Sequence, residues 1–176
     1  MSTASSAALS FLSRHVKAQP LSVLYRLTAD YRLPPSPRLA SLVHGQTVRC
    51  ESREDAGLAL YPDGSLDVYA PFFWDGSSPR VALRVFGRVL LSVGTPNGPK
   101  VAGGMRAATR GSMVHDRLCR SAPLLADALC VQEQSVYDAA DLVLLDIVSE
   151  DWSPWWGRRF YAAVRTFGDA YRAATG

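Results

Sequence analysis

The sequence predicts an α+β fold, in which a small antiparallel β-sheet within residues 45–95 packs on a C-terminal region of three helices. Alternating β-forming residues dominate the first of these segments, and apolar residues at helical spacing dominate residues 105–176. Strands that come first and helices that come last are typical of this class, and not of a doubly wound parallel sheet. The length of 176 residues and the 48% content of hydrophobic residues suit one domain with its own core.

Residues 1–44 are expected to precede this domain as an N-terminal helix and an extended, proline-rich arm. Phe11 and Leu12 share a helical spacing with nearby apolar residues, and Pro20 interrupts the pattern. Because the apolar stretch lacks a basic leader, we interpret it as a helix and not as a signal peptide. The stretch RLPPSPRL (32–39) is typical of a polyproline-like connector that lies against a neighbour. The expected division is therefore 1–44 and a single domain at 45–176.

The β-region begins with QTVRCES (46–52), where β-forming residues alternate with polar ones. In GLALYPDGSLDVYAPFF (57–73), the turn sequence PDG stands between two alternating runs, which predicts a β-hairpin. The stretch RVALRVFGRVLLSV (80–93) predicts a second strand pair or a bent ribbon, with Gly87 at the bend. Glycine and proline then predict a loop over 94–104.

Three helices are expected after this loop, at about 107–120, 132–149 and 155–173. The second has one apolar face made by Val136, Ala139, Ala140, Val143, Leu144 and Ile147. The third begins next to Pro154, a residue that suits the first helical turn. On this helix Arg158, Arg165 and Arg172 recur every seven residues. The opposite face is apolar and is made by Trp156, Phe160, Ala163, Val164, Phe167 and Tyr171.

His115 and Asp116, on the first of these helices, are the strongest candidates for chemistry. Neighbouring helical residues point about 100° apart, so adjacency alone does not predict a hydrogen-bonded pair. Asp141 or Asp138 on the next helix could reach the His115 ring, set its tautomer and raise its basicity. Asp116 could then hold a hard cation together with loop carbonyls. The alternative is a histidine at the edge of the core with an ordinary acidic neighbour.

Other candidate residues each have a structural and a functional interpretation. Asp75, in FFWDGSSPR (72–80), is typical of a turn, and as a site residue it would stand beside His115 and bind a cation. The three arginines of the last helix are either a solvated face or a contact for an acidic partner or nucleic acid. Trp155, near Trp152 and Trp156, would cap a core or belong to an interface with a partner.

Composition and missing motifs exclude several classes of protein. The net charge of +3 is too small to predict a nucleic-acid-binding protein by itself. The three cysteines form no CxxC pair, which predicts free thiols in a reducing cytoplasm. The three histidines lie far apart, so neither residue type has the spacing of a zinc site. GTPNGPK (94–100) lacks the spacing of a phosphate-binding loop. No apolar run reaches the roughly 18 residues of a membrane span. Because the sequence has neither the spacing of a zinc site nor that of a phosphate-binding loop, we expect no cofactor.

Four short motifs occur in a fixed order: DGSSPR (75–80), HDRLC (115–119), AADLVLL (139–145) and FYAAVRTFG (160–168). Together they resemble the phage and prophage family catalogued as domain of unknown function 1353, over about residues 56–168. The resemblance implies a bacteriophage or prophage origin, often near structural or tail genes. The His-Asp pair followed by Ala-Asp is also similar to the helical hairpin of phospholipases A2. That similarity implies that His115 activates a water, Asp116 binds calcium and Asp141 orients the histidine.

Two hypotheses of function follow. In the first, the protein is a bacteriophage virion structural protein, a tail, connector or capsid-associated subunit. It would be made in the bacterial host cytoplasm and would act by self-association or by docking to other virion proteins. In the second, it is a small hydrolase of lipid or cell-wall esters, with His115 as general base and Asp141 orienting it. Asp116 or Asp75 would then bind Ca²⁺ or the substrate. Trp155 and the arginines would serve partner binding in the first case.

Overall fold

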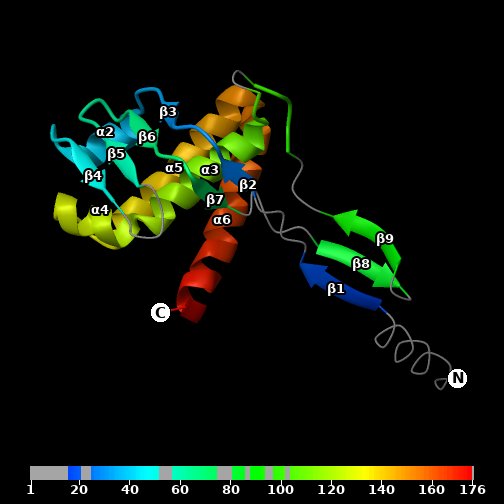
Figure 1. Ribbon diagram of the computed structural model, residues 1–176. Coiled ribbons are helices and arrows are strands. Elements are labelled where there is room, and N and C mark those ends of the chain that lie inside the picture. The colour runs from blue at the N-terminus through cyan, green and yellow to red at the C-terminus, as the bar shows by residue number, and fades with distance from the viewer. Residues whose placement is uncertain are drawn as a thin grey trace, which may run out of the picture. The chain divides into compact units, whose positions relative to one another are not determined.

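The computed structural model describes residues 16–20, 25–51, 57–74, 81–85, 88–93, 97–101 and 104–175 (Figure 1). The side chains of the first strand, of residues 81–93 and of residues 167–175 are not described. Most of the expected N-terminal helix, Asp75 and the bend at Gly87 lie outside the described residues, and so does the side chain of Arg172. The last residues expected in that helix, Val16–Pro20, form a strand instead.

The chain divides into two compact units. Unit 1 combines Met1–Val23 with Ser77–Pro96, and unit 2 combines Leu24–Gly76 with Asn97–Gly176. Unit 1 contains an antiparallel sheet in the order β1-β8-β9, made by Val16–Pro20, Val81–Val85 and Arg88–Val93. The expected strand pair of residues 80–93 is thus confirmed, and it adds a third strand from the N-terminal segment. The chain passes from one unit to the other after residues 23, 76 and 96. The expected division after residue 44 stays a prediction.

Unit 2 contains an antiparallel sheet in the order β3-β6-β5-β4, with a further pair β2-β7. The strands are β2 (Tyr25–Leu27), β3 (Tyr31–Leu33), β4 (Val48–Cys50), β5 (Leu58–Leu60), β6 (Leu66–Val68) and β7 (Phe72–Trp74). The predicted hairpin is confirmed as β5-β6, in which Leu60 faces Leu66. Its turn requires glycine, because Gly64 has a φ of +76° and a Cβ there would lie 2.0 Å from the Ser36 oxygen.

The segment expected to be an extended arm belongs to unit 2, and this corrects the prediction. Its first part is strand β3, which pairs with β6, and its second part is helix α2 (Pro37–Val43). Pro37 stands in the first turn of α2, where a proline loses no helical hydrogen bond. Leu39 and Val43 are fully buried. The prolines therefore end a strand and start a helix, because the apolar residues after them find a core to pack against.

The predicted C-terminal helices are confirmed, and one more is present than expected. The helices are α3 (Ala107–Arg120), α4 (Ala122–Leu129), α5 (Glu133–Asp151) and α6 (Pro154–Thr175). Helix α4 was missed because Pro123 follows α3 closely, and a proline in the first turn begins a new helix. None of the helices in the described part of the chain is long and apolar enough to cross a bilayer.

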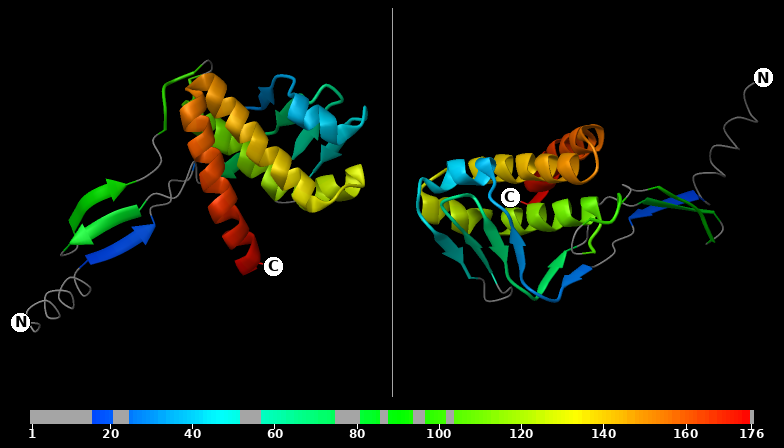
Figure 2. Two further views of the ribbon diagram at one scale, coloured as in Figure 1. Left: turned by 180° about the vertical axis from the view of Figure 1, so that it is seen from behind. Right: turned by 90° about the horizontal axis from the view of Figure 1, so that it is seen from above.

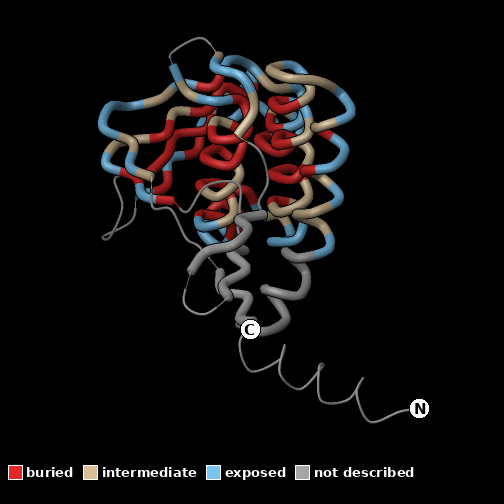
Figure 3. Tube along the Cα trace, turned by 90° about the vertical axis from the view of Figure 1, so that its right-hand side faces the viewer, coloured by how far each residue is buried: buried red, intermediate tan, exposed pale blue. Residues whose placement is uncertain are grey.

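The helices of unit 2 lie on one side of its strands (Figure 2), and the α+β class is confirmed. The buried segments gather in the middle of this unit (Figure 3). Leu58, Leu60, Leu66 and Val68 of the sheet, together with Met113 and Leu118 of α3, are fully buried in one core cluster. Close helix contact depends on small residues, since a Cβ at Gly111 would lie 2.8 Å from Leu144. This packing sets α3 beside α5, and α5 beside α6.

Candidate functional site

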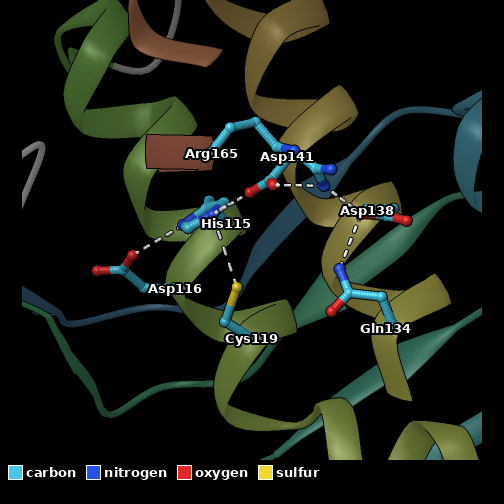
Figure 4. A network of polar contacts seen from close by, with 7 residues as sticks. All are labelled: His115, Asp116, Cys119, Gln134, Asp138, Asp141 and Arg165. Carbon is cyan, nitrogen blue, oxygen red and sulfur yellow. Dashed lines mark hydrogen bonds and ion pairs between the residues drawn. The ribbon is translucent and has the colours of Figure 1, made fainter. Parts of the chain in front are cut away.

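The side chain of His115 lies between two carboxylates where α3 packs on α5 (Figure 4). Its Nε2 is 2.9 Å from Oδ1 of Asp141, and its Nδ1 is 3.1 Å from Oδ1 of Asp116. Of the two acids considered on the second helix, Asp141 is therefore the one that meets the ring. Adjacency alone did not predict the contact with Asp116, which forms because both side chains turn toward each other along the surface of α3.

These contacts determine the charge of His115. Burial lowers the pKa of this imidazole, but the hydrogen bonds to Asp116 and Asp141 outweigh burial and raise the pKa well above its usual value. Each ring nitrogen can then carry a proton that it donates to a carboxylate. A general base needs an unprotonated nitrogen aimed at the substrate. In this geometry both ring nitrogens point to carboxylates, and the raised pKa favours the imidazolium form of His115.

Asp141 is the most deeply buried member of this cluster, with 1% of its side chain exposed. Its Oδ2 faces NH1 of Arg165, on α6, at 3.6 Å. Arg165 also forms a short ion pair with Asp138, whose Oδ1 accepts a hydrogen bond of 2.9 Å from Gln134. Two cations and three carboxylates thus join α3, α5 and α6. We call His115, Asp116, Asp138, Asp141 and Arg165 the three-helix network.

Cys119 is the remaining group at the ring, with Sγ 3.6 Å from Nε2 of His115. It lies one helical turn after His115 and is partly exposed. Asp116, predicted as a cation ligand, directs one oxygen to His115. Among the described residues, no three His, Cys, Asp or Glu side chains form a metal-binding group. The predicted position of Asp75 beside His115 falls outside those residues.

A second polar cluster was not foreseen. Arg110 of α3 donates hydrogen bonds to the Tyr31 hydroxyl at 2.7 Å and to Asp151 Oδ1 at 2.6 Å. Burial raises the pKa of Tyr31 and of Asp151, and Arg110 opposes both shifts. The cluster joins β3 to α3 and to the end of α5. No local pattern could reveal it, because its three members are far apart in the sequence.

The first two turns of α6 carry exposed aromatic and cationic groups. Trp152 and Trp156 stack at 4.3 Å and pack on the smaller core cluster, whereas Trp155 is 50% exposed. The Arg159 guanidinium lies 4.6 Å from the centre of the Trp155 ring. A shallow depression of about 430 Å³ is lined by Trp155, Arg158, Arg159 and Ala162, which we call the α6 surface.

The arginines predicted as one stripe have different surroundings. Arg158 is exposed on the α6 surface. Arg165 reaches back to α5 and joins the three-helix network, because its long side chain extends toward two carboxylates. Arg159, absent from the prediction, lies beside Trp155. Its signal was the Trp-Arg spacing of four residues, one helical turn.

Comparison with known proteins adds no relative. No family model, no curated protein and no solved structure matches this chain. The resemblance to the phage family and the similarity to phospholipases A2 therefore stay predictions.

Proposed function

We propose that the protein is a structural subunit that acts by self-association or docking, and not an enzyme. The observation that carries this proposal is the state of His115, whose two ring nitrogens both face carboxylates. The group expected to act as a base is thereby engaged in holding three helices together. The α6 surface supports a role in association, since exposed tryptophan and arginine are the residue types enriched at the centres of interfaces.

The order of the four motifs supports a more specific proposal. We propose that the subunit belongs to a bacteriophage particle, in its tail, connector or capsid. Such particles are built from many copies of few chains, so self-association would be part of the function.

Solution mass tests the association. Light scattering after size-exclusion chromatography, at rising protein concentration, is expected to give a mass above that of one chain. A mass of one chain at every concentration would contradict self-association. For the hydrolase alternative, the measurement is release of product from a phospholipid ester with Ca²⁺. The expected result is no release by the wild type. Release that the His115→Ala variant loses would overturn the proposal.

A further inference from the structure

Helix α4 carries a second exposed surface of different charge. Leu124 is 47% exposed, an unusual position for a large apolar side chain in the described residues. Asp127 follows three residues later, so both side chains lie on the same side of α4 and both are exposed. We call this pair the α4 surface.

The charges of the α4 and α6 surfaces complement each other. The α6 surface has an exposed indole beside Arg158 and Arg159, and the α4 surface has an exposed aliphatic side chain beside a carboxylate. In the part of the chain that the structure describes, no ion pair involves Arg158, Arg159 or Asp127. Their charges are therefore available to a partner.

The two surfaces lie at opposite ends of one helix. Helix α4 ends shortly before the first residue of α5, and α6 begins just after its last residue (Figure 1). The 19 residues of α5 span about 28 Å at 1.5 Å per residue. Because the length of α5 separates them, the two surfaces of one chain do not contact each other. They can meet between two copies.

A symmetric contact between two α6 surfaces would place arginines against arginines, which is unfavourable. A head-to-tail contact places Asp127 against those arginines and Leu124 against the exposed indole. We propose that the α6 surface of one copy binds the α4 surface of the next copy. This inference rests on the proposed self-association and names its interface. Repeated head-to-tail contacts close into rings or continue as filaments.

Charge reversal tests the interface. The variants are Arg158→Glu and Asp127→Lys, and the controls of equal charge change are Arg49→Glu and Glu51→Lys, at exposed positions of the β4 region. Each interface variant is expected to weaken self-association by about tenfold or more, because it places like charges opposite each other. The controls are expected to associate as the wild type does. Thermal unfolding by circular dichroism verifies that each variant is folded.

Mixing the two variants separates this interface from others. Asp127→Lys keeps an intact α6 surface and Arg158→Glu keeps an intact α4 surface, so their mixture is expected to restore association in sedimentation experiments. The uncharged variants Leu124→Ser and Trp155→Ser are mixed in the same way, in case a charge reversal prevents folding.

Three outcomes would overturn the inference. A mixture that stays dissociated would mean that the two surfaces do not bind each other. Variants that associate like the wild type would show that the α4 and α6 surfaces do not form the interface, but would not contradict the proposed self-association. A monomeric wild type would overturn both the proposed self-association and the α4–α6 interface. This outcome includes the case in which the α6 surface binds only an acidic peptide of another protein.

Discussion

Replacing Asp141 by asparagine removes the buried charge on which the three-helix network depends. The substitution keeps the shape of the side chain but takes a carboxylate away from His115 and Arg165. Removing one partner of a buried ion pair costs about 3–5 kcal/mol. The His115 side chain is 15% exposed and can release its proton, so we expect the lower end, a loss of about 3 kcal/mol in the free energy of unfolding.

The loss is expected to depend on pH in one direction. The pKa of His115 is raised in the folded protein, so its contribution to stability is fully present below the unfolded value of about 6.5 and is lost as the pH rises through the folded value. The difference between wild type and Asp141→Asn should therefore be largest at or below neutral pH and shrink in alkaline solution. In the variant, the folded pKa of His115 moves toward its ordinary value.

Urea unfolding from pH 6 to pH 10 measures the stability difference, and proton NMR follows the titration of His115. Asp138→Asn is the matched control, because Asp138 is 47% exposed and contacts Arg165 at the surface. It should change stability little. Equal losses in the two variants would refute the reasoning, as would a wild-type His115 that titrates at or below its ordinary pKa.

Three further outcomes are expected. Gly157→Ala should destabilise the fold by about 1–2 kcal/mol in thermal unfolding despite its better helix propensity, because its Cβ would lie 2.7 Å from the backbone oxygen of Leu145, which cannot turn aside as the Ser149 hydroxyl can. An unchanged midpoint would contradict this close α5-α6 packing. Arg110→Lys should cost about 2 kcal/mol in urea unfolding, since lysine has no fork to reach both of its partners; a loss below 0.5 kcal/mol would count against the cluster. With a disulfide reagent, exposed Cys130 should react fast and buried Cys50 only on unfolding, because burial also raises the pKa of the Cys50 thiol. Rapid reaction of Cys50 in the native Cys130→Ser variant would disagree with its burial.

Local patterns were sufficient for the elements whose residues are neighbours in the sequence. The PDG turn and its two alternating runs predicted β5 and β6, and the apolar spacing predicted α3, α5 and most of α6. The sequence also placed Asp141 among the two acids that could reach His115, because the helices that carry these residues lie close together in the chain, although the short helix α4 stands between them. In each case the deciding interaction lies within a few turns or between adjacent elements.

Contacts between distant segments decided the rest. Leu39 lies in a helix instead of an extended arm because a sheet formed by later residues offers it a core. Arg110 finds Tyr31 and Asp151 only when α3 lies against both β3 and the end of α5.

Local sequence and distant contacts likewise contribute separately to the role of His115. The sequence by itself determined that this histidine stands on a helix beside an acid, and that two acids on a later helix, Asp138 and Asp141, could reach it. The tertiary structure decided that both ring nitrogens meet carboxylates and that NH1 of Arg165 lies 3.6 Å from the buried Oδ2 of Asp141. Whether a histidine serves as base or as cation depends on the charges around it, and distant parts of the chain supply those charges.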